Sequence, residues 1–139
     1  MAPNPRIPTP EGLNAEFYAR AQSGVVHLQQ CSDCGLLRHP PRYHCPRCAS
    51  GSFGWSPSAG RGQLFSWTVT HLPFDRGWAE EVPYISAVVE LDDGVRVVGS
   101  LEGVAADELR IGLPLTLRAT PLAPEFTFLT FHPCQGEAP

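Results

Sequence analysis

The second half of the chain alternates between apolar and polar residues with a period of two. In GQLFSWTVTH this pattern predicts a strand over residues 62–71, with Phe65, Trp67 and Val69 on its apolar face. PYISAVVEL and GVRVVGSL continue the alternation. Asp92-Asp93-Gly94 lies between them and favours a tight hairpin, because these residue types tolerate a positive φ.

The same alternation returns in LPLTLRAT and EFTFLTFHP, and AADELRIG before them indicates a short helical turn. Strands are therefore expected at 62–71, 83–91, 94–101, 113–120 and 125–131. Strands in this number, with a helical interruption before the fourth, match an OB-fold barrel, and a small split sandwich would give a similar pattern.

The N-terminal region has a different character. Residues 1–9 are a proline-rich lead-in, and Thr9-Pro10-Glu11 is typical of a helix start, with a capping hydroxyl, a proline at the first helical position and an acid near the positive end. The helix is expected to run through NAEFYARAQ and to stop near Ser23-Gly24, with Phe17 and Tyr18 packed on the rest of the protein.

GVVHLQQ then predicts a short strand that leads into a cysteine-rich segment. After that segment, residues 50–62 are rich in Gly, Ser and Pro and indicate a linker or loop between two lobes. The chain is thus expected to consist of a lead-in and helix (1–23), a ribbon (24–55) and an OB-fold domain (60–132). The predicted fold class is mainly β, with an N-terminal helix and a rubredoxin-like zinc ribbon followed by a five-stranded OB-fold barrel.

The cysteine-rich segment, CSDCGLLRHPPRYHCPRC, has the spacing C-x2-C-x10-C-x2-C. Two such turns bring four thiolates onto one ion, and a reducing compartment favours metal ligation over disulfides. We therefore predict one Zn²⁺ held by Cys31, Cys34, Cys45 and Cys48. A closed four-sulfur shell leaves no position for water or substrate, so this zinc is expected to be structural.

Related knuckles bind iron in rubredoxins, but there the two pairs are much further apart. His39 and His44 lie between the pairs and are expected to stay outside the ligand shell. Cys134 is distant in sequence and is expected to be a free thiol, with no assigned role.

The composition narrows the possible chemistry. All ten basic residues are arginine, so Schiff-base, phosphate-loop and pyridoxal-phosphate lysines are excluded within this chain. None of the common nucleophile or nucleotide motifs occurs, and the five histidines are scattered. No catalytic residue is predicted. A net charge of -4 gives no sign of a nucleic-acid or membrane-surface protein. With no apolar h-region and no long apolar run, we expect a soluble cytoplasmic protein.

Two groups of residues are candidates for contact with a partner or substrate. The ribbon is locally basic, with Arg38, Arg42 and Arg47, and Arg61 nearby, against a single Asp33, which suits either a solvated surface or contact with phosphate or acidic groups. Of these, Arg38 and Arg42 are the candidates for contact. The long loop THLPFDRGWAEEVPY carries Phe74, Trp78 and Tyr84, where a simple turn would be polar. The alternative for this loop is that it folds back on its own barrel.

The order of these parts resembles the DUF35 family of acyl-CoA-associated zinc-ribbon/OB-fold proteins. The resemblance rests on the Phe17-Tyr18 pair, the cysteine segment, GRGQLFSWTVTH, PYISAVVELDDGVRVVGSL and LRIGLPLTL. It implies a non-catalytic subunit that accompanies a thiolase-fold enzyme, such as a thiolase or a lipid-transfer-protein-like aldolase that shortens steroid side chains. It also implies a role in binding or enclosing a CoA thioester, with acyl-CoA at the shared interface.

A nucleic-acid-binding module is the competing class, because zinc ribbons and OB-folds both serve that role elsewhere. It would need a continuous basic groove with stacking aromatic residues. The barrel offers only Arg76, Arg96, Arg110 and Arg118, so the accessory-subunit hypothesis is favoured.

Overall fold

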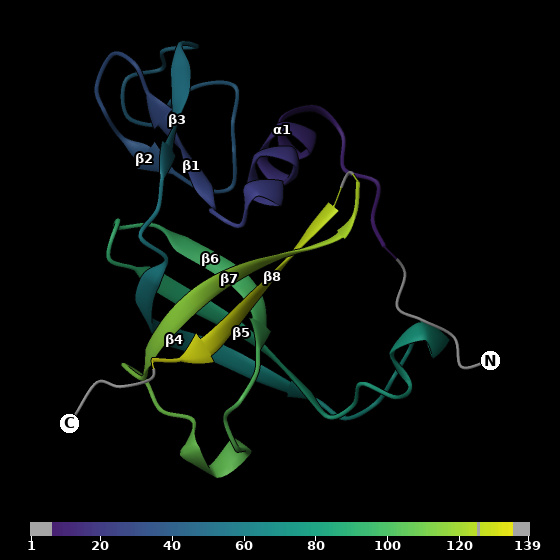
Figure 1. Cartoon of the computed structure of the whole chain (residues 1–139). Helices are drawn as coiled ribbons and strands as arrows, with labels where there is room; N and C mark the ends of the chain where they lie inside the picture. The colour runs from purple at the N-terminus through teal and green to yellow at the C-terminus, as the bar shows by residue number, and fades with distance from the viewer. Residues whose placement is uncertain (1–6, 125, 135–139) are drawn as a thin grey trace.

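The computed structural model describes residues 7–124 and 126–134. The chain begins with α1 (Gly12–Arg20) and a 3-10 turn, η1 (Ala21–Ser23), continues into a small three-stranded sheet and ends in a closed barrel (Figure 1). This mainly β architecture, with an N-terminal helix, a ribbon and an OB-fold barrel, confirms the predicted fold class. None of the helices in the described part of the chain is long and apolar enough to cross a membrane.

The small sheet has the order β2-β1-β3 and the barrel the order β4-β5-β6-β8-β7. The sheet consists of β1 (His27–Cys31), β2 (Leu37–Arg38) and β3 (Phe53–Pro57). The barrel consists of β4 (Arg61–Thr70), β5 (Tyr84–Leu91), β6 (Arg96–Leu101), β7 (Pro114–Ala123) and β8 (Phe126–Pro133). Short 3-10 turns lie in two of its loops, η2 (Arg76–Trp78) and η3 (Ala106–Glu108). The five predicted barrel strands and the turn before the fourth are all present.

The barrel interior is filled by apolar side chains. Its strands pair antiparallel except β6 and β8, whose parallel pairing of Leu101 with Phe131 closes the cylinder. Gly99 on β6 lies against the Phe131 ring. A Cβ atom at position 99 would lie only 2.8 Å from a carbon atom of this ring, which is too close. A glycine is therefore needed for the ring to fill the barrel. The fully buried interior residues include Leu64, Ala87, Val89, Val97, Leu115 and Phe131.

The face assignment predicted for the first barrel strand is wrong at its start. A β-bulge shifts the register between Leu64 and Ser66, so Leu64 is buried while Phe65 is exposed. Beyond the bulge, Trp67 and Val69 pack against the core as predicted. The Arg96 guanidinium instead lies over the Phe65 ring, with 3.7 Å between Cζ of Arg96 and the ring centroid. A bulge adds one residue to a strand and so reverses which side chains point inward.

The linker predicted over residues 50–62 contains a strand. β3 pairs antiparallel with β1 along its length, from Cys31 opposite Phe53 to His27 opposite Pro57. Phe53 and Trp55 alternate along it and meet edge to face, 6.0 Å between ring centroids. The surrounding Gly and Ser residues mask this alternation in the sequence, and the segment acts as the third strand of the ribbon before it enters β4.

The predicted helix end is confirmed and the predicted start is wrong. Gly24 follows η1 with φ of 90°, a left-handed residue that stops the helix. At the other end the cap is Glu11, not Thr9, and its side chain makes no capping hydrogen bond. Gly12 has φ of 59°, so the chain turns at Gly12 after the extended Glu11, and the proline lies outside the helix.

The helix joins the ribbon to the barrel, as expected for Phe17 and Tyr18. Phe17 is 1% exposed and contacts the ribbon rings, with 6.5 Å between its centroid and that of Trp55. The Tyr18 ring lies on Phe126 of β8, 4.9 Å between centroids. Buried Thr127 donates its hydroxyl to the Tyr18 carbonyl at 2.9 Å, which fixes α1 against β8.

Candidate metal centre and aromatic groove

Two similar turns present the four ribbon cysteines. In the first, Gly35 donates its N–H to the carbonyl of Cys31 at 3.0 Å. In the second, Ala49 donates to the carbonyl of Cys45 at 2.8 Å. Gly35 has φ of 78° and Ala49 has φ of 66°, the left-handed conformation that each turn needs after its second cysteine. The sequence thus builds two equivalent knuckles, one with the favoured glycine and one without it.

The four sulfur atoms form one compact cluster. The Sγ atoms of Cys31, Cys34, Cys45 and Cys48 all lie within 4.8 Å of one another. The Cys31–Cys48 pair is 3.5 Å apart and the Cys34–Cys45 pair 3.6 Å. Thiolates bound at about 2.3 Å to a tetrahedral Zn²⁺ would stand about 3.8 Å apart. The donor set and its spacing therefore fit zinc, and the separations exceed the roughly 2.05 Å of a disulfide.

Backbone N–H groups favour the thiolate form of Cys31 and Cys45. At Cys48, by contrast, the Ser50 N–H is outweighed by the neighbouring cysteine side chains and by burial, which raise the pKa of Cys48 to about 12. Cys34 donates its N–H to Cys31 Sγ at 3.4 Å, and this bond is the main reason that the pKa of Cys31 is lowered to about 6. Burial raises the pKa of Cys45, but N–H groups of Cys48 and Arg47 outweigh it and the net shift is downward. Thiolates are the form that binds a metal ion.

The two ribbon histidines lie outside this cluster, since the ligand group contains cysteines alone among the described residues. His39 packs on Phe17, with 4.9 Å between ring centroids, and burial lowers its pKa to about 4. It is a neutral ring in the joint between the ribbon and α1. His44 is exposed beside Gly51.

Arg38 is buried, which corrects the expectation that it forms part of a basic surface. It is 5% exposed, donates Nε to Gln29 Oε1 at 2.8 Å and donates Nη2 to the carbonyl of Arg42 at 2.9 Å. Gln29, also buried, accepts from the Arg42 N–H at 2.7 Å. These bonds hold the loop between the knuckles. The Arg42 side chain is exposed, so of the two predicted contact arginines only Arg42 faces solvent.

The aromatic residues predicted on the β4–β5 loop divide into two groups. Phe74 is 92% exposed at the tip of the loop. The rings of Trp78 and Tyr84 contact each other at a tilt of 43°, with 5.1 Å between centroids, and both residues are partly buried. Asp75 stabilises the intervening η2 turn by accepting the Gly77 N–H at 2.8 Å. The loop therefore folds back with two of its aromatic residues and leaves the third free for a contact.

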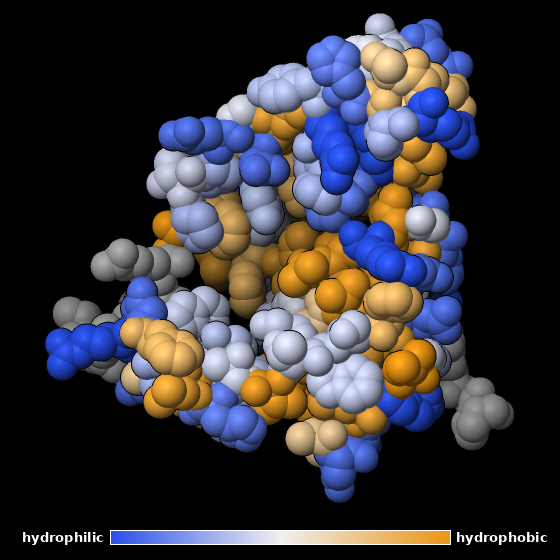
Figure 2. Space-filling model, turned by 180° about the vertical axis from the view of Figure 1, so that it is seen from behind, coloured by the Kyte–Doolittle hydropathy of each residue, from blue (hydrophilic) through white to orange (hydrophobic). Residues whose placement is uncertain are grey.

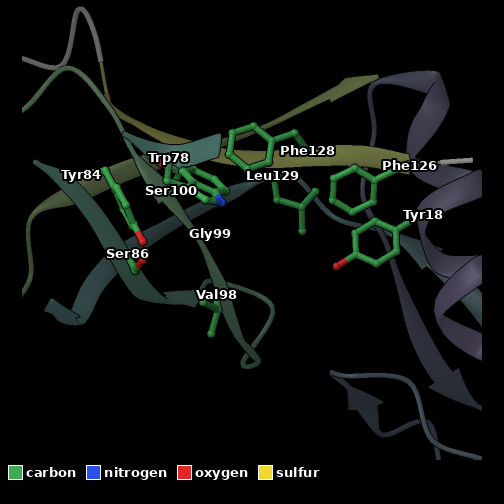
Figure 3. Close-up of a pocket in the computed structure, with 10 residues that line it drawn as sticks. All are labelled: Tyr18, Trp78, Tyr84, Ser86, Val98, Gly99, Ser100, Phe126, Phe128 and Leu129. Carbon is green, nitrogen blue, oxygen red and sulfur yellow. The ribbon is translucent and has the colours of Figure 1, made fainter. Parts of the chain in front are cut away.

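Trp78 and Tyr84 form one wall of a hollow that we call the aromatic groove. Tyr18 of α1 and Phe126 of β8 form the opposite wall, and Phe128 of β8 lies between the two walls (Figure 3). Its larger part has a volume of about 560 Å³. The second wall was not predicted from the sequence. Its signal was the alternate aromatic spacing in EFTFLTF, which places Phe126 and Phe128 on one side of the strand.

The described residues offer no convincing nucleophile–base arrangement. Thr130 Oγ1 lies 2.9 Å from His132 Nε2, a contact between a hydroxyl and an imidazole. Glu102 Oε2 approaches the same nitrogen at 3.8 Å, so it does not orient the ring from its other side as the third member of a triad does. Thr130 is itself buried, which leaves no access for a substrate.

Comparison with known proteins agrees with this geometry. Residues 19–54 match the family model of the rubredoxin-like zinc ribbon domain of ChsH2, and residues 55–120 match that of the C-terminal OB-fold domain of ChsH2. Among solved structures, a chain of the "Ltp2-ChsH2(DUF35) aldolase" is similar, with 38% identity and a TM-score of 0.82. The match covers 91% of this chain and 98% of that one. The protein belongs to the DUF35 family, as its sequence pattern suggested.

Relatives with other names match as well. A "Probable enoyl-CoA hydratase alpha subunit" of Thermomonospora curvata is 40% identical over 122 residues. The "3-oxo-4,17-pregnadiene-20-carboxyl-CoA hydratase alpha subunit" of Mycobacterium tuberculosis is 34% identical over 120 residues. Each match covers 86% of this chain but only 37% of the relative. A "DUF35 domain-containing scaffold protein" of Methanocaldococcus jannaschii is 27% identical over 85 residues, 60% of each chain.

Proposed function

We propose that this chain is a non-catalytic zinc-ribbon/OB-fold component that assembles with a thiolase-fold enzyme acting on CoA thioesters. The observation that carries the proposal is the similarity, over nearly the full length of both chains, to the DUF35 chain of an aldolase that also contains Ltp2. The scaffold name of an archaeal relative supports the same role. The proposed division into a helical lead-in (1–23), ribbon (24–55) and OB-fold domain (60–132) is part of this hypothesis, as is a cytoplasmic location.

The metal centre in this proposal is one structural Zn²⁺ on Cys31, Cys34, Cys45 and Cys48. When bound, the ion cross-links the two knuckles and polarises no substrate, because a four-sulfur shell has no open position. The chain's own residues prepare the site. Backbone N–H groups stabilise the thiolates of Cys31 and Cys45, and the Gln29–Arg38–Arg42 hydrogen bonds hold the connecting loop in place.

The aromatic loop is the proposed contact with the enzyme. Phe74 is 92% exposed, and a protein gains stability when such a ring is buried in a partner. Trp78 and Tyr84 of the same loop segment line the groove, so a partner bound at Phe74 would lie near the groove. A CoA thioester would then lie at the shared interface. The hydratase relative that acts on a pregnadiene carboxyl-CoA suggests a bulky acyl group.

Co-expression with an Ltp2-type thiolase-like enzyme of the same organism tests the proposal. Size-exclusion chromatography at micromolar concentration should show one complex that contains both chains. Phe74→Ala should weaken the complex about thirtyfold, the effect of losing about 2 kcal/mol. Ile111→Ala, which truncates another exposed apolar residue, is the matched control and should leave it intact. Separate elution of the two unmodified proteins would contradict the proposal.

A second arrangement is favoured by the hydratase relatives. Because this chain spans 37% of each hydratase alpha subunit it matches, the same fold also exists as one part of a larger subunit. The chain would then associate with a hydratase. Co-purification with a hydratase subunit instead of a thiolase-like enzyme would support this second function.

A further inference from the structure

The aromatic groove lies between α1, the β4–β5 loop, β6 and β8. On this face of the molecule, apolar side chains gather around a hollow (Figure 2). One part has a volume of about 560 Å³. A smaller part of about 210 Å³ adjoins it, since Trp78, Tyr84, Ser100, Phe126 and Phe128 line both. Pockets for small molecules in proteins typically measure about 300–1,000 Å³, so the groove has the size of a ligand site.

The walls of the groove are set before any ligand binds. On one side, the Tyr18 ring rests on Phe126, and its backbone is held by the Thr127 hydroxyl. On the other side, the Trp78 ring packs at a tilt against Tyr84, at the end of the η2 turn that Asp75 caps (Figure 3). A pocket that is already formed costs a ligand less ordering free energy than one that must be assembled.

Apart from two exposed carboxylates, the polar groups in the groove are few and uncharged. Ser86 and Ser100 come from the barrel strands, and the Trp78 indole and the Tyr84 hydroxyl come from the loop wall. None of these side chains hydrogen-bonds to another side chain or carbonyl in the part of the chain that the structure describes. They can therefore donate to, or accept from, a hydroxyl or carbonyl group on a ligand.

The charges at the groove disfavour an anionic ligand. The charged residues that line it are Glu81 and Glu102, both exposed carboxylates at the edge of the larger part. No arginine lines either part. Arg42 and Arg96 instead border a different hollow, between the ribbon and β5–β6. Phosphate or sulfonate groups would meet repulsion in the groove and no cation.

We propose that the aromatic groove binds a neutral, hydrocarbon-rich small molecule that carries a hydroxyl or carbonyl group. In a CoA thioester this portion is the acyl group, and the nucleotide stays outside the groove. The identity of the natural ligand as an acyl group rests on the proposed function, whereas the preference for a neutral apolar molecule rests on the groove alone.

The test uses the zinc-loaded 139-residue chain without any partner. N-phenyl-1-naphthylamine, a neutral fluorescent probe, is titrated and compared with 1-anilinonaphthalene-8-sulfonate, which has the same ring system and a negative charge. The neutral probe should bind with a Kd at least about tenfold lower, the effect of about 1.4 kcal/mol. Equal affinity for the two probes, or no binding of the neutral one, overturns the proposal.

Ser100→Phe fills the groove and should weaken binding of the neutral probe at least about tenfold. Ser66→Phe adds the same ring at an exposed position of β4 outside the groove and should leave the Kd unchanged. Zinc content and circular dichroism establish that each variant is folded, and Ser86→Phe replaces Ser100→Phe if the latter does not fold. Unchanged binding in the folded groove variant overturns the proposal. Because no partner is present, failure of complex formation cannot produce this result.

Discussion

The ribbon and the barrel of this small protein are stabilised in different ways. Toward the cysteine end of the ribbon, the buried side chains are Cys31 and Cys45 together with the polar pair Gln29 and Arg38. The barrel interior is made of aliphatic and aromatic side chains such as Leu64, Val97 and Phe131. A lobe as short as the ribbon cannot bury enough apolar surface to fold alone. It relies on ligand bonds and hydrogen bonds, whereas the barrel relies on burial and on closure of its sheet.

Because the two regions are stabilised differently, they tolerate different changes in sequence. A barrel without free edges can accept loops of many kinds, and here it carries the aromatic loop between β4 and β5. The ribbon has little to replace a lost ligand, because structural zinc contributes on the order of 10 kcal/mol to the folding of such lobes. Changes to the ribbon should therefore act through the metal, and changes to the barrel through packing.

The largest effect is expected for Cys45→Ser. The variant should lose its zinc, from about one ion per chain to none, and the ribbon should unfold while the barrel strands remain. Elemental analysis and circular dichroism measure the two effects. Cys134→Ser is the matched control, because this thiol lies beside Thr116, away from the cluster, and zinc should be retained. Iron at full occupancy in the unmodified protein would contradict the metal assignment.

Phe131→Ala should produce the opposite pattern. Phe131 is fully buried, so its truncation should lower the free energy of unfolding by about 3–5 kcal/mol through lost burial and a cavity. The zinc content should stay at that of the unmodified chain. Urea unfolding followed by circular dichroism gives the free energy, and Phe74→Ala, the same truncation at an exposed ring, should change it by less than about 0.5 kcal/mol. Loss of zinc in Phe131→Ala would show that zinc binding in the ribbon depends on packing in the barrel, and would contradict the separate stabilisation of the two regions.

The joint between the two regions should respond to pH through His39. Burial lowers the pKa of this ring from 6.5 to about 4, so the unfolded chain takes up the proton first. The contribution of neutral His39 to the free energy of unfolding is therefore complete above pH 6.5. As the pH falls from 6.5 toward 4, protonation of the unfolded chain lowers the free energy of unfolding by about 3 kcal/mol at most. His39→Phe keeps a ring against Phe17 and should flatten this part of the stability–pH curve. A parallel loss of stability in both proteins would assign the acid sensitivity to other groups.

Much of this comparison could be predicted from the sequence, for physical reasons that differ by region. The cysteine spacing is sufficient to predict the metal centre, because two CxxC turns joined by a short loop bring their four thiolates onto one ion. Period-2 alternation located the barrel strands, but it cannot detect a bulge, so Phe65 was assigned to the wrong face. Glycine-rich surroundings hid β3. The burial of Arg38 depends on Gln29, a partner in the neighbouring strand, and no local pattern indicates such a pairing.

The groove was harder still to predict. Its lining comes from Tyr18, from the loop around Trp78 and from Phe126 and Phe128, which are more than a hundred residues apart at the extremes. Each of these aromatic residues was visible in the sequence. Their convergence follows from the packing of α1 on β8, which is fixed by a buried threonine that has no distinctive sequence signal.

The smallest expected effect distinguishes the two knuckles of the ribbon itself. Ala49 holds φ of 66° at the position where the first knuckle has Gly35. An L-residue with a side chain pays roughly 1 kcal/mol in this conformation relative to glycine, although glycine gives part of that back as entropy in the unfolded chain. Ala49→Gly should therefore stabilise the zinc-loaded protein by about 0.5 kcal/mol, and Gly35→Ala, the reverse change at the equivalent position, should destabilise it by about the same amount. Competition with a zinc chelator measures both changes, because strain in a knuckle weakens the metal site directly. If Ala49→Gly lowers the zinc affinity, the left-handed turn is not a source of strain in the second knuckle.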